Sequence, residues 1–102
     1  MMNRKMLKQA QDMQRRLAAV QEELAEARTE GTAGGGVVKA LVVGGNRVES
    51  IEISQEVVDP EDVEMLQDLI AAAVNDALEN ASKQAAEKMS AITGGMNIPG
   101  LF

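Results

Sequence analysis

Apolar residues recur in alternating steps of four and three along residues 3–27, and this spacing constrains the fold more than any other feature of the 102-residue chain. Such steps bring side chains to one narrow side of a helix, as in a coiled-coil seam. The sequence therefore predicts a long amino-terminal helix whose apolar stripe must pack against something. The stripe consists of Met6, Ala10, Met13, Leu17, Val20, Leu24 and Ala27.

Positive charge is concentrated at the start of this helix. Residues 1–16 hold five basic residues and one acid, whereas residues 17–78 hold three basic residues and thirteen acids. An acidic body with a basic end can meet a polyanion with that end first, although a solvated helix face would explain each charge equally well. The five basic residues are Arg4, Lys5, Lys8, Arg15 and Arg16.

Size and residue types exclude several classes of protein. A chain of 10.9 kDa forms one small domain with a modest core, which favours oligomers, and we expect a dimer. Because the chain has no Cys and no His, disulfides, thiolate metal sites and histidine-based catalysis are not expected. No stretch approaches the roughly 18 apolar residues of a membrane span, and the charged start does not suit a signal peptide. We expect a cytoplasmic protein.

Glycine-rich turns and apolar runs in the middle of the chain predict a small sheet. Residues 37–43 are rich in β-branched and apolar side chains. Within residues 47–53, the apolar residues Val48, Ile51 and Ile53 flank or alternate with polar residues. The sequence Gly44-Gly45-Asn46 between them is typical of a hairpin turn. An isolated two-stranded hairpin is only marginally stable in water. We therefore expect that residues 28–33 add a third strand, that the hairpin pairs with that of a second protomer, or both.

A second long helix is predicted to begin near Asp59 and to reach Thr93. Asp59 is expected to be its N-cap and Pro60 its first helical residue. Its apolar arc is wider than the stripe of the first helix, as contact with both a sheet and a helix requires. The glycines that follow are expected to end it, so residues 1–93 form a single domain and residues 94–102 a flexible tail.

These elements predict an α+β fold, with long terminal helices flanking a small antiparallel three-stranded sheet. Because the helices are longer than the strands, they overhang the sheet with their free ends on the same side. Lys83 and Lys88 are therefore expected near the basic end of the first helix and join its five basic residues as candidate nucleic-acid contacts. The candidate dimer interface consists of Val37, Val38, Leu41, Val43, Ile51, Ile53, Leu66 and Ile70.

The remaining motifs do not indicate catalysis, a cofactor or a metal. The glycines at 34–36 precede a strand and lack the ending of a phosphate-binding loop. The acids around residue 60 lack the spacing of an EF-hand, and helix capping explains them. No histidine is present to activate a serine.

Most of the chain resembles the YbaB/EbfC family of nucleoid-associated proteins. The resemblance is carried by GGGVVKALVVGGNRVESIEIS, VVDPEDVEMLQDLIAAAVNDALENA and EKMSAITGGMNIPG, and it is most specific over residues 59–77. It implies an α-β-α protomer, a homodimer shaped like tweezers, a place in the nucleoid-associated cytoplasm, and binding to bacterial DNA that alters its conformation. It does not mark which residues touch DNA.

Two functions of different class remain open. The first is a homodimer that binds duplex DNA through phosphate contacts with little sequence specificity, with effects on nucleoid organisation and gene expression. Base stacking is not expected because Phe102 is the only aromatic residue. The second is a protein-interaction module whose overhanging helices clasp a partner helix of unknown identity.

Overall fold

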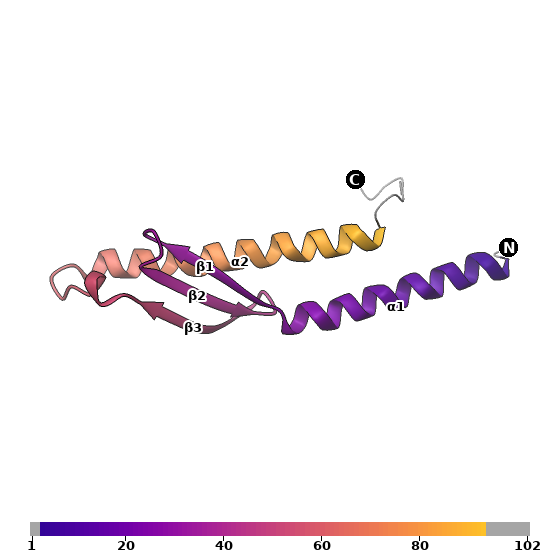
Figure 1. The fold of residues 1–102 in the computed structure, drawn as a ribbon, viewed down its shortest axis with the longest axis horizontal. Coiled ribbons are helices and arrows are strands. Elements are labelled where there is room, and N and C mark those ends of the chain that lie inside the picture. The colour runs from indigo at the N-terminus through magenta and orange to yellow at the C-terminus, as the bar shows by residue number, and fades with distance from the viewer. Residues whose placement is uncertain (1–2, 94–102) are drawn as a thin grey trace.

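The computed structural model describes residues 3–93, which form two long helices joined by a three-stranded sheet (Figure 1). The predicted α-β-α protomer is confirmed, and its principal extents are 70 × 24 × 16 Å. The predicted glycine helix end and carboxyl-terminal tail lie outside the described residues. Within residues 3–93 neither long helix is apolar enough to cross a membrane. The elements are α1 (Arg4–Glu26), β1 (Arg28–Ala33), β2 (Val38–Val43), β3 (Arg47–Ile53), the short 3-10 helix η1 (Gln55–Val57) and α2 (Val63–Thr93).

The first helix begins with a side-chain cap and ends against the sheet. The Asn3 Oδ1 atom accepts a hydrogen bond from the Met6 backbone N–H at 2.8 Å, which satisfies one of the unpaired donors of the first turn. At its other end, the Ala27 carbonyl accepts from the Gly44 N–H at 2.9 Å. The base of α1 is therefore held by the turn between β2 and β3.

The sheet has the order β1-β2-β3 with both pairs antiparallel, so residues 28–33 supply the third strand. Gly44 and Gly45 adopt positive φ angles of 66° and 71°, which is the geometry of a tight hairpin turn. The register between β2 and β3 shifts between Leu41 and Val42, leaving Glu49 as an extra residue in β3. The predicted hairpin is confirmed, with an irregularity that the sequence pattern did not indicate.

One face of the sheet is covered by α2, and the core lies between them. Val38, Ala40 and Val42 of β2 are buried against Ala73 and Ala77 of α2. A Cβ atom at Gly31 would lie 2.1 Å from the Ala77 backbone nitrogen. The strand and helix backbones therefore approach so closely that only glycine fits.

Two side chains of α2 also bond the outer edge of β1. The Thr32 N–H donates to the Asp76 carboxylate at 2.9 Å, and the Asn80 side-chain amide donates to the Glu30 carbonyl at 3.1 Å. Asp76 thus has a structural role as a hydrogen-bond acceptor. These bonds occupy backbone groups that an added strand would use.

The start of α2 differs from the sequence prediction. The helix begins at Val63, and its cap is Asp62, whose Oδ1 accepts from the Met65 N–H at 3.2 Å. Asp59 instead accepts from the Glu61 N–H at 2.9 Å within a turn that precedes the helix. Both aspartates suit a helix cap, and the turn at residues 59–62 assigns that role to the second one.

Candidate nucleic-acid interface

The five basic residues of α1 occupy one side of the helix, and all are exposed. At about 100° per residue, Arg4, Lys8 and Arg15 fall within about 40° of one another, with Lys5 and Arg16 beside them. The apolar stripe runs along the opposite side. We call these five residues the basic arc. The arc and the stripe therefore lie on different surfaces of α1.

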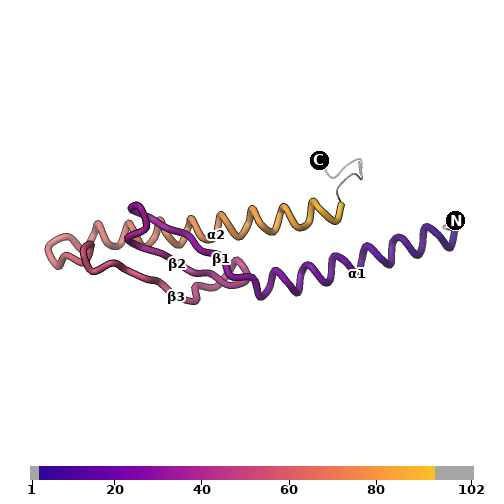
Figure 2. Tube along the Cα trace, viewed as in Figure 1, coloured from indigo at the N-terminus to yellow at the C-terminus, as the bar shows by residue number. Residues whose placement is uncertain are grey.

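The arc lies on a part of α1 that extends past the rest of the described chain (Figure 2). The two helices run antiparallel, and an ion pair between Lys88 and Glu23 marks where they lie level. Since α2 is described for five residues beyond Lys88, its last turn lies level with residues near Ala18. About 14 residues of α1, or about 21 Å of helix, therefore protrude.

The charges of α1 run against its helix dipole. The first turn carries Arg4 and Lys5 and no acid, and the last turn carries Glu26 and no basic residue. The positive end of a helix dipole lies at its amino terminus, where cations are unfavourable by typically about 0.3–1 kcal/mol each. Helix stability therefore does not explain this arrangement, which points to a role for the charges outside the helix.

The arc is largely unneutralised by the protein itself. Arg15 forms an ion pair with Asp12 at 3.4 Å, yet its side chain remains 76% exposed. Within the described residues, no carboxylate oxygen lies within ion-pair distance of the other four arc residues. Their charge is available to a ligand in solvent.

The expectation that Lys83 and Lys88 lie near the amino-terminal tip is wrong. Lys88 pairs with Glu23, which is 19 residues along α1 from Arg4 and hence about 28 Å away. Five residues apart on one helix, the two lysines point about 140° apart. Helix α1 extends beyond the last described turn of α2, so the two free ends do not lie side by side. The basic arc therefore consists of residues of α1 alone.

The opposite end of the molecule is acidic. The turn before α2 and the first two turns of that helix carry no basic residue. Two of the carboxylates there, those of Asp59 and Asp62, bind backbone N–H groups. Charge is thus separated along the longest axis of the molecule. The acids are Glu56, Asp59, Glu61, Asp62, Glu64 and Asp68.

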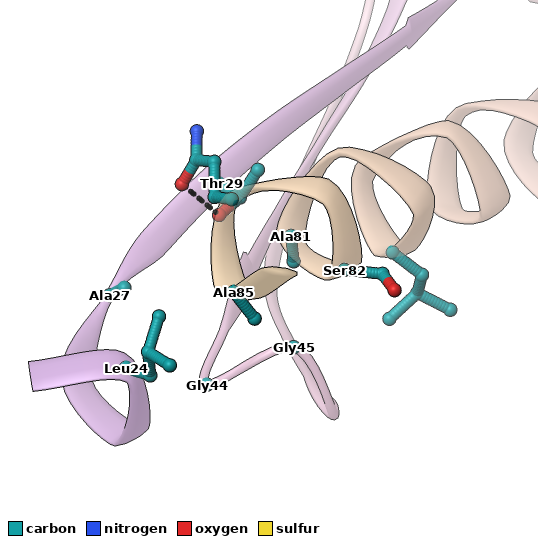
Figure 3. A pocket seen from close by; sticks show the side chains of 10 residues that line it. Leu24, Ala27, Thr29, Gly44, Gly45, Ala81, Ser82 and Ala85 are labelled. Atoms are coloured by element: carbon teal, nitrogen blue, oxygen red, sulfur yellow. Dashed lines mark hydrogen bonds between the residues drawn. The ribbon is translucent and has the colours of Figure 1, made fainter. Parts of the chain in front are cut away.

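A hollow of about 260 Å³ lies where α1, the β2–β3 turn and α2 meet (Figure 3). Thr29 and Gln84 face one another there, with the hydroxyl and the amide oxygen 3.5 Å apart. None of the side chains that line it is an ionisable acid or base, and no histidine is present to activate its two hydroxyl groups, those of Thr29 and Ser82. Its lining is Leu24, Ala27, Thr29, Gly44, Gly45, Leu78, Ala81, Ser82, Gln84 and Ala85.

An apolar row on β3 remains uncovered on the side of the sheet that α2 packs against. Val48, Ile51 and Ile53 pair with Val42, Ala40 and Val38, so both sets share a face. The set on β2 is buried, but Ile51 is 39% and Val48 49% exposed. We call these three residues the β3 row.

The residues of the predicted dimer interface are divided among different surfaces. Val38 is fully buried beneath α2 of its own chain, so its proposed contact with a partner is wrong. Leu41 and Val43 lie on the face away from α2, whereas Ile51 and Ile53 belong to the β3 row. Val37, Leu66 and Ile70 pack against the core at its margin and are half-buried. Sequence alternation alone could not separate these faces, because it does not say which face the helix covers.

The structure perturbs the pKa of one exposed pair. Arg28 of β1 donates two hydrogen bonds to the Glu49 carboxylate, at 2.8 and 3.1 Å. The hydrogen bond with Arg28 lowers the pKa of Glu49, and the same bond raises the pKa of Arg28. This pair joins the two outer strands across β2 and lies away from the basic arc.

The fold and its charge separation define a class: an elongated α-β-α protein with a protruding basic helix on an acidic body. The profile of the YbaB/EbfC DNA-binding family matches residues 1–96. A nucleoid-associated protein of Thermoanaerobacter pseudethanolicus is 56% identical over 97 residues, covering 95% of this chain and 87% of that protein. A nucleoid-associated protein of Chloroflexus aurantiacus is 52% identical over the full length of both chains. The chain belongs to the YbaB/EbfC DNA-binding family.

A solved structure supports the same fold. The crystal structure of the uncharacterized protein HP0035 from Helicobacter pylori superposes with a TM-score of 0.69 at 20% sequence identity. The match covers 92% of this chain and all of that one. Similarity at this level of identity establishes the architecture of the chain.

Proposed function

We propose that the protein binds duplex DNA as a homodimer through the basic arc, with little sequence specificity, and changes the conformation of the DNA. The observation that carries this proposal is the protruding basic part of α1, whose charges oppose the helix dipole and remain exposed. Lys and Arg neutralise phosphates and release condensed counterions, and such contacts carry no sequence information directly. The names of the relatives and of the family support DNA as the ligand.

The acidic body supports binding at the tip of α1. Acids outnumber basic residues by ten over residues 17–78, so that region repels a phosphate backbone. Because the basic arc and the acidic residues lie at opposite ends of the long axis, the arc can contact DNA while the acids remain distant from it. We expect the contact to be confined to the first four to five turns of α1.

The exposed surface supports a dimer. The chain exposes 7791 Å², whereas a compact monomer of its mass would expose about 5,600 Å². The β3 row offers an apolar surface for a partner, and β3 forms the sheet edge that α2 does not bond. We propose that two protomers associate through the β3 row and the neighbouring flank of α2.

Such a dimer presents two basic arcs, which supports a role in bridging or bending DNA. Two separated phosphate-binding surfaces on one particle can hold two segments of duplex or impose a path on one. We propose that the dimer acts in this way in the nucleoid of the bacterial cytoplasm, where altered DNA conformation affects the expression of nearby genes.

Salt-dependent binding tests the DNA proposal. Fluorescence anisotropy of random-sequence duplex, titrated at several salt concentrations, should give binding that weakens steeply as salt rises. The slope of log affinity against log salt counts the phosphate contacts, and a second duplex of unrelated sequence should give a similar affinity. Absence of binding at low salt would refute the proposal.

A matched pair of substitutions tests the dimer. Ile51→Asp places a charge in the β3 row, whereas Ser50→Asp places the same charge on the other face of the same strand. Light scattering after size exclusion should report a monomer for the first variant and a dimer for the second. Equal behaviour of the two variants would exclude the β3 row as the interface.

A second candidate function is the clasping of a partner helix between α1 and α2. The observation that favours it is the exposed end of the apolar stripe, where Met6 is 53% exposed. An amphipathic helix could lie in that position. Reversing charge at Arg4 and Lys8 should weaken DNA binding strongly and leave such a clasp intact, so the two functions are separable.

A further inference from the structure

The apolar stripe of α1 loses its cover part of the way along the helix. Leu17, Val20 and Leu24 are half-buried where α2 lies beside them, and Met6 and Ala10 further out are exposed. No other described element approaches that end of the helix (Figure 1). A methionine-containing stripe of coiled-coil type is therefore left without a partner in residues 3–93.

The chain itself continues from the point where this cover ends. The last described turn of α2 lies level with residues near Ala18 of α1, and the helix runs toward the amino-terminal end of α1. Nine further residues follow Thr93. An extended segment of that length reaches about 30 Å, whereas the protruding part of α1 measures about 21 Å.

The composition of residues 94–102 suits an apolar surface. The segment carries no Asp, Glu, Lys or Arg, and it contains the only aromatic residue of the chain. Pro99 disfavours a helix, and an extended peptide can lay side chains along a helical groove. Its large apolar residues are Met96, Ile98, Leu101 and Phe102.

We propose that residues 94–102 dock on the apolar stripe of α1 between Met6 and Leu17, continuing the cover that α2 provides up to that point. The segment buries the stripe and leaves the basic arc on the opposite side of α1 open to solvent. Because none of its side chains is charged, these side chains neither repel phosphate nor compete with it for the basic arc. It holds α1 as a stiff arm over the length that projects from the body.

Charge argues against a second copy of α1 as the occupant. Pairing two stripes side by side would bring together two segments that each carry five basic residues and one acid. Although the two arcs would face outward from such a pair, the net positive charge of both segments disfavours the pairing, most of all at low salt. The segment that follows Thr93 meets no such penalty.

A single tryptophan tests the docking in the full-length protein. The chain has no Trp and no Tyr, so Phe102→Trp creates one reporter. Its emission should be blue-shifted, and acrylamide should quench it about twofold less than a free peptide of residues 94–102 with the same Trp. Quenching equal to that of the peptide would overturn the docking.

Matched substitutions on α1 locate the binding surface. Met13→Asp, added to the Trp variant, should restore peptide-like quenching, whereas Gln11→Asp should not, because it places the same charge about 160° away around the helix. Circular dichroism confirms that both variants remain helical. Unchanged quenching in the Met13→Asp variant would overturn the assigned surface.

A spin label distinguishes the chain's own segment from that of a partner. Since the chain lacks cysteine, Leu101→Cys accepts one label. Relaxation enhancement should broaden amide signals of residues 6–17 within the labelled molecule. Broadening seen only between labelled and unlabelled copies would show that the segment crosses to the partner, and would overturn the intramolecular proposal. The result does not depend on whether DNA binds.

Discussion

The two helices of this protein are built on opposite electrostatic plans. Helix α2 begins with the acidic cap Asp62 and carries Glu64 in its first turn, which complements the dipole, and its two buried alanines pack in the core. Helix α1 begins with Arg4 and Lys5 and has no fully buried residue. The comparison separates two roles: α2 packs against the sheet to form the core, and α1 holds the basic residues at a distance from that core.

The contrast extends to how each helix is held. Side chains of α2 bond β1 through Asp76 and Asn80, and Gly31 admits its backbone. Helix α1 contacts the rest of the described chain mainly at its base, near the β2–β3 turn and the Lys88–Glu23 pair. Changes in α2 should therefore act on stability, and changes in the first turns of α1 should act on binding.

Gly31→Ala should have the largest effect of any single change. Its Cβ atom would lie 2.1 Å from the Ala77 nitrogen and 2.5 Å from the Ala73 carbonyl oxygen, so α2 must separate from β1. We expect a loss of about 3 kcal/mol or more in the free energy of unfolding, measured by urea denaturation.

The matched control for this change is Gly35→Ala. Gly35 has a φ of 74° and no atom within 4 Å of an added Cβ, so only backbone strain of about 1–2 kcal/mol applies. Equal losses for the two variants would show that α2 does not need close contact with β1.

Charge reversal in α1 should weaken DNA binding strongly without loss of stability. The double variant Arg4→Glu and Lys8→Glu should weaken DNA binding by about 100-fold in an anisotropy titration. Acids in the first turns complement the dipole, so the melting temperature should stay the same or rise. A fall in stability would show that these residues serve the fold.

The control for charge reversal lies on the sheet. Reversing Lys39 and Arg47, both exposed on the strands, changes the net charge by the same amount. Binding in this double variant should fall far less than in the α1 variant. Equal weakening would indicate that net charge alone governs the affinity.

The two helix caps give the next contrast. Asp62→Ala should lower the free energy of unfolding by about 1 kcal/mol, because α2 belongs to the cooperative core. Asn3→Ala removes the same kind of bond, but should only reduce hydrogen-exchange protection in the first turn of α1, leaving urea denaturation unchanged. Equal effects on urea denaturation would contradict the division between the helices.

The smallest effect is expected from Glu49→Gln, which breaks the pair with Arg28 just past the end of α1. Because the hydrogen bond lowers the pKa of Glu49 in the folded state, the stabilisation is present at neutral pH. It is lost as the pH falls through the folded-state pKa, below the ordinary carboxyl value of 4.5. Melting temperatures of the two proteins should differ slightly at neutral pH and converge in acid.

The sequence predicted those features that depend on neighbours in the chain. The period of three and four along α1, the Gly-Gly turn between β2 and β3 and the order of the elements all follow from local rules. The start of α2 was misplaced by three residues because Asp59 and Asp62 both suit a cap. Only the turn that Asp59 forms with Glu61 decides between them.

By itself, the sequence determined the order and kind of the long helices and strands, the separation of charge along the chain and the basic arc, since each depends on residue order and helical period. Tertiary structure alone decided that α2 covers Val38, that Gly31 admits the Ala77 backbone, and that Lys88 pairs with Glu23 far from the tip. These contacts join residues distant in the chain. Their geometry depends on how two backbones approach in space. The spacing of residues along one helix or strand carries no information about that approach.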